Sequence, residues 1–316
     1  MKRVIIIILI VELIGALLYG LYNYLEHRSD SEEISFTLHD TLPDGEGREA
    51  TVIILAGQSN ASGTSRDEYL ERNVSVEKYA EYQQGYDNVY INYAVSGYHF
   101  SEGFVTCGAK QGEGGGYFGP ELGMAEKLSE LYPDETFFIV KYAWGGTNLF
   151  EQWLSPSSGK KGDMYREFEV FVETSLKYLV SKNYDIKIEG MCWMQGESDS
   201  FSVKNGTDYE IHLANFISDV RERFAPYADD DGIAFVDAYI ADNPVFWVYC
   251  DYVNESKRRV AELSPMNALV DTISHGLTCG EEPDDVPDLA HYDSMSELKL
   301  GHLFIDELSR FMEDGK

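Results

Sequence analysis

Three short segments, far apart in the chain, carry residues that together could perform nucleophilic catalysis by serine. They read Gly57-Gln58-Ser59-Asn60, then Trp193-Met194-Gln195-Gly196-Glu197, then Asp288-Leu289-Ala290-His291. Acyl transfer by serine needs a hydroxyl, an imidazole that takes its proton, a carboxylate that orients the imidazole, and donors for the oxyanion. The three segments contain a candidate for each of these groups.

The candidate base is His291, because Asp288 lies three residues before it. A carboxylate at this spacing can accept the Nδ1–H of the same imidazole and thereby fix its tautomer. The candidate nucleophile is Ser59, which follows an apolar run and a glycine that permits close backbone approach. Each also has a simpler interpretation: a turn serine is commonly a helix cap, and Asp-x-x-His is commonly a surface pair.

Candidate oxyanion donors follow two other apolar runs. Gly145 and Gly146 could present backbone N–H groups, and Gln195 could present its side-chain amide. The alternatives are an ordinary turn for the glycines and a buried amide that bonds to backbone for Gln195. The neighbouring Glu197 and Asp199 are expected to brace loops.

The pattern between these segments predicts an α/β fold. Short apolar runs, typical of strands buried on both faces, cover 51–55, 89–93, 137–143, 186–194 and 233–236. Amphipathic stretches that predict helices cover 121–131, 164–180, 209–224, 255–263 and 296–311. This alternation predicts a mostly parallel sheet with helices on both faces. Since function gathers beyond the carboxyl ends of such strands, the three segments should meet at one edge of the sheet, where the Gly-rich loop 95–119 is expected to shape the substrate pocket.

The residue pattern at the N-terminus predicts that the rest of the chain is exported from the cytoplasm. Lys2 and Arg3 precede an apolar run that ends near residue 24, long enough to cross a bilayer as a helix. We therefore expect a transmembrane signal anchor over 1–25, an acidic stalk over 26–49 and one catalytic domain over 50–316. This places the protein in the cell membrane as a single-pass protein, with its catalytic domain outside the cytoplasm. Secretion after signal cleavage is the alternative.

Composition excludes one class of partner. The 316 residues carry 25 Lys and Arg against 55 Asp and Glu, a formal charge of −30, which argues against binding nucleic acid. Cys107, Cys192, Cys250 and Cys279 show no metal-binding spacing. In an exported chain one or two disulfides are permitted; Cys250 and Cys279 are the closer pair, and Cys192 is expected to be a buried thiol. The acidic clusters at 229–231 and 284–285 are expected to be solvated loops.

Taken together, Gly-Gln-Ser-Asn, Gly-Gly-Thr, Trp-x-Gln-Gly-Glu-Ser-Asp and a late Asp-x-x-His resemble the carbohydrate acetylesterase branch of the SGNH hydrolases. That branch includes sialate O-acetylesterase-like and family 6 acetylxylan esterase domains. The resemblance covers about 50–311 and implies a three-layer α/β/α sandwich of the SGNH, flavodoxin-like type, without metal or cofactor. It implies the following roles: Ser59 as nucleophile, His291 as base, Asp288 as its orienter, the Ser59 amide, a Gly145–Gly146 amide and Gln195 as the oxyanion hole, and Gln58, Asn60 and Glu197 as supporting residues.

The resemblance also implies the reaction, removal of O-acetyl groups from sugars or polysaccharides through an acetyl-enzyme. Two alternatives remain open at this point: an esterase or thioesterase for short acyl groups on non-sugar substrates, and a membrane-tethered carbohydrate-binding protein without activity. Trp144, Trp153 and Trp193 near the predicted edge weakly favour stacking on sugar rings. The oligomeric state stays open.

Overall fold

The computed structural model describes residues 34–314, and its centre is a mixed β-sheet with strand β1 (Glu49–Gly57) in the middle. The strand order is β10-β9-β8-β1-β7-β3-β4, with β5 also paired to β3. Strands β10, β9, β8, β1, β7 and β3 run parallel, and β4 and β5 pair antiparallel with β3. The other strands are β3 (Tyr86–Val95), β4 (His99–Phe100), β5 (Val105–Cys107), β7 (Phe137–Ala143), β8 (Asp185–Met194), β9 (Ala234–Ala238) and β10 (Asn267–Val270).

The central strands are apolar because helices cover both faces of the sheet. Every residue of β7 is buried, and in β1 the residues Val52, Ile53, Ile54 and Leu55 are fully buried. The five predicted strands are all present, each within a few residues of its predicted limits. The short strands β4 and β5 carry no alternating pattern long enough to predict, and β10 is only four residues long.

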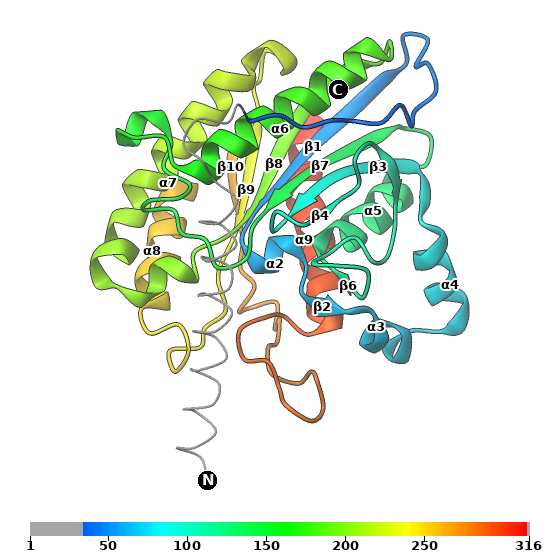
Figure 1. The fold of residues 1–316 in the computed structure, drawn as a ribbon. Helices are drawn as coiled ribbons and strands as arrows, with labels where there is room; N and C mark the ends of the chain where they lie inside the picture. The colour runs from blue at the N-terminus through cyan, green and yellow to red at the C-terminus, as the bar shows by residue number, and fades with distance from the viewer. Residues whose placement is uncertain (1–33, 315–316) are drawn as a thin grey trace. The chain divides into compact units, whose positions relative to one another are not determined.

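Helices form the two outer layers (Figure 1). Helices α6, α7 and α8 lie against one face, and α5 and α9, which pack on each other, cover the other. The predicted α/β/α sandwich with a mostly parallel sheet is thus confirmed. The helices are α2 (Ser59–Ser62), α3 (Asp67–Asn73), α4 (Val76–Gln84), α5 (Pro120–Leu131), α6 (Asp163–Ser181), α7 (Val203–Phe224), α8 (Cys250–Ala261) and α9 (Ser294–Asp314); a two-stranded ribbon joins β2 (Ser65–Arg66) to β6 (Tyr117–Phe118).

The predicted stalk over 26–49 needs correction at its C-terminal part, because the compact unit begins at Phe36. The Phe36 ring packs edge-on against Phe171, with ring centroids 5.0 Å apart. Tyr178 Oη accepts hydrogen bonds from the backbone N–H groups of Thr41 and Leu42. Segment 36–48 therefore belongs to the domain, whose limit moves from residue 50 to residue 36. A half-buried aromatic ring and the buried Leu42 are a weak sequence signal in an otherwise polar segment.

The predicted anchor over 1–25 lies outside the described residues. Within 34–314, none of the helices combines the length and apolar character that crossing a bilayer requires. All four cysteines lie in this part of the chain and are free thiols, so the suggested Cys250–Cys279 disulfide does not form. Cys192 is a buried thiol, as predicted, and burial raises its pKa well above the usual range.

Candidate active site

The predicted segments do meet at one edge of the sheet. Gly57 at the end of β1 lies in register with Ala143 at the end of β7 and with Met194 at the end of β8. The Ser59 turn, the Gly145 turn and Gln195 each follow directly from these three strand ends. Parallel pairing is the cause, because it puts the carboxyl ends of neighbouring strands side by side.

The turn that carries Ser59 requires a glycine before it. Gly57 has a φ of +145°, and a Cβ there would lie 1.9 Å from the carbonyl oxygen of Met194. Only glycine therefore lets β1 end against β8 and turn at once into helix α2. Ser59 is the first residue of that helix, where a backbone N–H has no acceptor within the helix. Its side chain retains a small exposure of 8%.

Gly145 lies next to Ser59. A Cβ built on Gly145 would be 3.6 Å from the Cβ of Ser59. The Gly145 N–H donates to Ser96 Oγ at 3.2 Å, a long bond from which it can be displaced. Gly146 follows in the left-handed region, with a φ of +72°. The Gly145 amide is thus near enough to the nucleophile to serve as an oxyanion donor.

His291 and Asp288 form the predicted pair. His291 Nδ1 lies 2.7 Å from Asp288 Oδ2, which leaves Nε2 for another partner. Burial lowers the pKa of His291, but the hydrogen bond and charge of Asp288 more than offset it, and the net pKa is raised above 6.5. Burial raises the pKa of Asp288, and the bond to His291 outweighs this, so its carboxyl group has a lowered pKa. The geometry matches a base and its orienting carboxylate.

Asn60 connects the nucleophile turn to the histidine loop. Its Oδ1 accepts from the backbone N–H of Tyr292 at 3.2 Å, and the carbonyl of Tyr292 accepts from Ser65 Oγ at 2.7 Å. Both backbone polar groups of Tyr292, the residue after His291, are therefore held by residues close to Ser59 in the sequence. The structure thus brings the His291–Asp288 pair and Gly145 to the Ser59 turn, although these three segments lie far apart in the sequence.

Gln195 is completely buried, and its side chain is surrounded by protein partners. Nε2 contacts three acceptors: Gln58 Oε1 at 3.1 Å, the Thr147 carbonyl at 3.0 Å and Asp199 Oδ2 at 2.7 Å. Two N–H bonds shared among three acceptors leave no donor for a substrate oxygen. This differs from the expected oxyanion contact and agrees with the alternative of a buried amide that holds backbone.

Asp199 braces the segment after the Gly145 turn. Its carboxylate accepts from the backbone N–H groups of Leu149 and Phe150 as well as from Gln195. Burial raises its pKa to about 6, against the opposing effect of these hydrogen bonds. Trp153 and Trp193 are also fully buried, with ring centroids 5.1 Å apart, so neither is placed to stack on a substrate.

Glu197 lies buried beneath the nucleophile turn. Its Oε1 accepts from Asn60 Nδ2 at 2.7 Å, whereas Oε2 has no hydrogen-bond partner among the described residues. Burial raises the pKa of Glu197, and its bonds to backbone and Asn60 offset part of that effect. The Asn60–Glu197 bond therefore lies beneath the nucleophile turn, where both residues are buried.

Glu113 is a site residue that the sequence motifs do not indicate. It lies in the Gly-rich loop, and its Oε1 accepts from Ser96 Oγ at 2.6 Å. A Cβ on Gly145 would lie 2.8 Å from the same oxygen. The charge of Glu113 also contributes to the raised pKa of His291. The Gly-rich sequence of this loop indicates that the loop lies at the pocket. It does not indicate which of its residues reaches the site.

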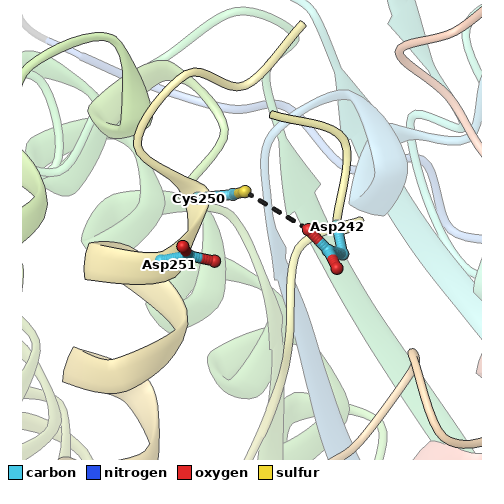
Figure 2. Close-up of side chains that lie close together, drawn as sticks. All are labelled: Asp242, Cys250 and Asp251. Carbon is cyan, nitrogen blue, oxygen red and sulfur yellow. Dashed lines mark hydrogen bonds between the residues drawn. The ribbon is translucent and has the colours of Figure 1, made fainter. Parts of the chain in front are cut away.

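Asp242, Cys250 and Asp251 form one further group of possible metal ligands in the described part of the chain (Figure 2). Cys250 Sγ donates to Asp242 Oδ1 at 3.8 Å. Burial and the two neighbouring carboxylates raise the pKa of this thiol, which disfavours the thiolate that a metal requires. Exposed carboxylates are common without a metal, and we assign no site here.

Comparison with solved structures supports the fold. A protein of Arabidopsis thaliana aligns with a TM-score of 0.58 and 17% identity over 82% of this chain and 98% of its own. NanS aligns with a TM-score of 0.59 and 15% identity over 87% and 99%. A carbohydrate acetylesterase from Xanthomonas citri aligns with a TM-score of 0.51 and 14% identity over 84% and 56%. No curated protein matches the sequence.

The family comparison covers most of the chain. Residues 49–310 match the family described as carbohydrate esterase, sialic acid-specific acetylesterase. This range runs from the first residue of β1 into helix α9 and so contains all three motif segments. The chain therefore belongs to the sialic acid-specific acetylesterase family, and it is a carbohydrate esterase.

Proposed function

We propose that the protein removes O-acetyl groups from sugars with Ser59 as the nucleophile. The observation that carries this proposal is the His291–Asp288 pair, held beside the Ser59 turn by the bond between Asn60 and Tyr292. Because Nδ1 of His291 is bonded to Asp288, Nε2 is the atom that takes the serine proton. The raised pKa of His291 suits a base that must hold this proton until the leaving group departs.

The first half-reaction forms an acetyl-enzyme. Ser59 Oγ attacks the acetyl carbonyl carbon while its proton moves to His291 Nε2. The N–H groups of Ser59 and Gly145 stabilise the oxyanion, and the Gly145 N–H exchanges Ser96 Oγ for this oxygen. When the tetrahedral intermediate collapses, the C–O bond to the sugar breaks and His291 returns the proton to the sugar oxygen.

The second half-reaction releases acetate. Water gives a proton to His291 Nε2 and attacks the acetyl carbonyl, and the collapse restores the Ser59 hydroxyl. We infer that Gln195 and Asp199 act by holding the backbone from Thr147 to Phe150, and thus the Gly145 turn, rather than by touching the oxyanion.

Acetate release tests the reaction. Full-length protein is assayed with partially acetylated sugars, 9-O-acetyl sialic acid and 4-nitrophenyl esters of increasing chain length. We expect release of acetate from a sugar, with a loss of at least about 10³-fold in Ser59→Ala. Ser62→Ala is a matched control on the same short helix. Equal activity in Ser59→Ala would refute the assignment, and a preference for long acyl chains would favour a lipid or thioester substrate.

We also propose that the N-terminal apolar run anchors the protein in the cell membrane with the catalytic domain outside. The support is the sequence alone: two basic residues, a run of about 21 residues whose only charge is Glu12, and then an acidic segment. Retention of the esterase in membranes after an alkaline carbonate wash is the expected result. Recovery of a shortened chain in the medium would show signal cleavage instead.

A further inference from the structure

A carboxylate lies beside the proposed nucleophile without a role in the acyl-transfer steps. The Cβ position of Gly145 is 3.6 Å from Ser59 Cβ and 2.8 Å from Glu113 Oε1, so Glu113 reaches the same small region as the Ser59 side chain. A negative charge here opposes the oxyanion that forms during turnover. Its placement therefore calls for a compensating use, such as an interaction with the substrate.

The two oxygens of Glu113 differ in their surroundings. Oε1 is held by Ser96 Oγ at 2.6 Å, whereas the contact recorded for Oε2 is a long one, 3.5 Å, from the hydroxyl of Tyr98. Ser96 adopts a left-handed φ of +49°, and Gly97 follows at +71°. A Cβ at Gly97 would lie 2.2 Å from the Trp144 ring, so only glycine fits there. The turn 96–98 is thus fixed. It holds Glu113 through Ser96 and places the exposed Tyr98 beside Glu113 Oε2.

The charged groups that raise the pKa of the base are carboxylates. The charges that most raise the pKa of His291 belong to Asp288, Glu113 and Glu197. The two lysines that are buried in the described part of the chain are each paired with a carboxylate: Lys141 with Glu121 at 2.7 Å, and Lys257 with Asp237 at 2.5 Å. A substrate carboxylate at this position would meet repulsion, whereas a hydroxyl can donate to Glu113.

We propose that Glu113, with Tyr98 beside it, binds a free hydroxyl of an uncharged sugar next to the acetylated one and excludes sugars that carry a carboxylate there. The inference rests on the proposed function and adds a substrate class to it. Glu113 is then a specificity-determining residue: Oε2 accepts the hydroxyl proton, and the Tyr98 ring lies along the sugar.

The test uses matched substrates that differ in one group. Partially acetylated methyl glucopyranoside offers every hydroxyl position, and the corresponding glucopyranosiduronate replaces a CH₂OH by a carboxylate. The methyl ester of the uronate restores neutrality at nearly the same size. The value of kcat/KM is measured for full-length wild type, Glu113→Gln, and the matched control Glu102→Gln, which removes an exposed carboxylate on the neighbouring turn. 9-O-acetyl sialic acid and its methyl ester are run in parallel.

We expect wild type to prefer the glucoside and the uronate methyl ester over the free uronate by about 10-fold or more, as charges a few ångströms apart at a protein surface allow. Glu113→Gln should reduce this ratio to about 1–3, and Glu102→Gln should leave it unchanged. Equal rates for uronate and ester in wild type, or the same ratio in Glu113→Gln, would overturn the inference. Absence of Ser59-dependent acetate release from every sugar would instead refute the proposed function, and the inference with it.

Discussion

Replacing Asn60 by Ala is expected to loosen the link between the nucleophile turn and the histidine loop. Two hydrogen bonds are lost: the one that Tyr292 N–H donates to Oδ1 and the one that Nδ2 donates to Glu197 Oε1. Each loss leaves a buried partner unsatisfied, which costs about 1–3 kcal/mol. Glu197 is affected strongly, because its Oε2 already has no hydrogen-bond partner in the described structure and Asn60 is the side chain that bonds to Oε1. The free energy of unfolding should therefore fall by about 3 kcal/mol.

This change is measurable in both stability and rate. In a domain of this size, about 3 kcal/mol corresponds to a decrease of roughly 6–12 °C in Tm. Displacement of His291 relative to Ser59 should also lower kcat/KM for a 4-nitrophenyl acetate by about 10²-fold. Asn215→Ala is the control, because its amide donates to Ser158 Oγ in a part-buried contact away from the site. A Tm within 2 °C of wild type, or kcat/KM within about 3-fold, would refute the reasoning.

Three further predictions concern the base, the turn and the core. The acid limb of the pH profile of kcat/KM should have its midpoint above pH 6.5, because His291 must be neutral to act as a base and its pKa is raised. Asp288→Asn should move this midpoint to lower pH and reduce kcat/KM by up to about 10⁴-fold. A midpoint that does not move in Asp288→Asn would contradict the assignment of Asp288. Gly57→Ala should lower the free energy of unfolding, measured in urea, by about 3 kcal/mol or more. Gly47 also has a positive φ but has no neighbour within 4 Å of an added Cβ, so Gly47→Ala should lower the free energy of unfolding less. Equal losses in the two variants would show that contact with Met194 does not matter. Lys141→Met should lower the free energy of unfolding by about 3–5 kcal/mol, because it leaves the Glu121 carboxylate buried without its partner. Adding Glu121→Leu should restore part of this stability. No recovery in the double variant would argue against the ion pair as the cause.

The apolar pattern of the strands in the sequence predicts the edge of the sheet at which the site lies. The runs that became β1, β7 and β8 are mostly apolar, and such runs are characteristic of strands covered on both faces. Parallel pairing then places Ser59, Gly145 and Gln195 along one edge. The His291–Asp288 pair was equally accessible, since both residues lie within one turn of chain and their contact depends on local spacing.

Two features of the tertiary environment could not follow from such local patterns. Phe36 is one ring in a polar segment, and its packing against Phe171 depends on a helix more than a hundred residues away. Gln195 follows a strand end as expected, but the partners of its amide come from Gln58, Thr147 and Asp199. Only the assembled fold decides whether a buried amide faces a substrate or its own protein.

The sequence by itself thus determined the layers of the fold, the motif segments that meet at the sheet edge and the local histidine–aspartate pair, because these depend on periodicity and on spacing within a turn. The tertiary structure decided how the site is completed. Asn60 reaches Tyr292, and Glu113 reaches the Gly145 turn, across long separations in the chain. Such contacts depend on the paths of loops, which no repeating pattern of apolar residues records.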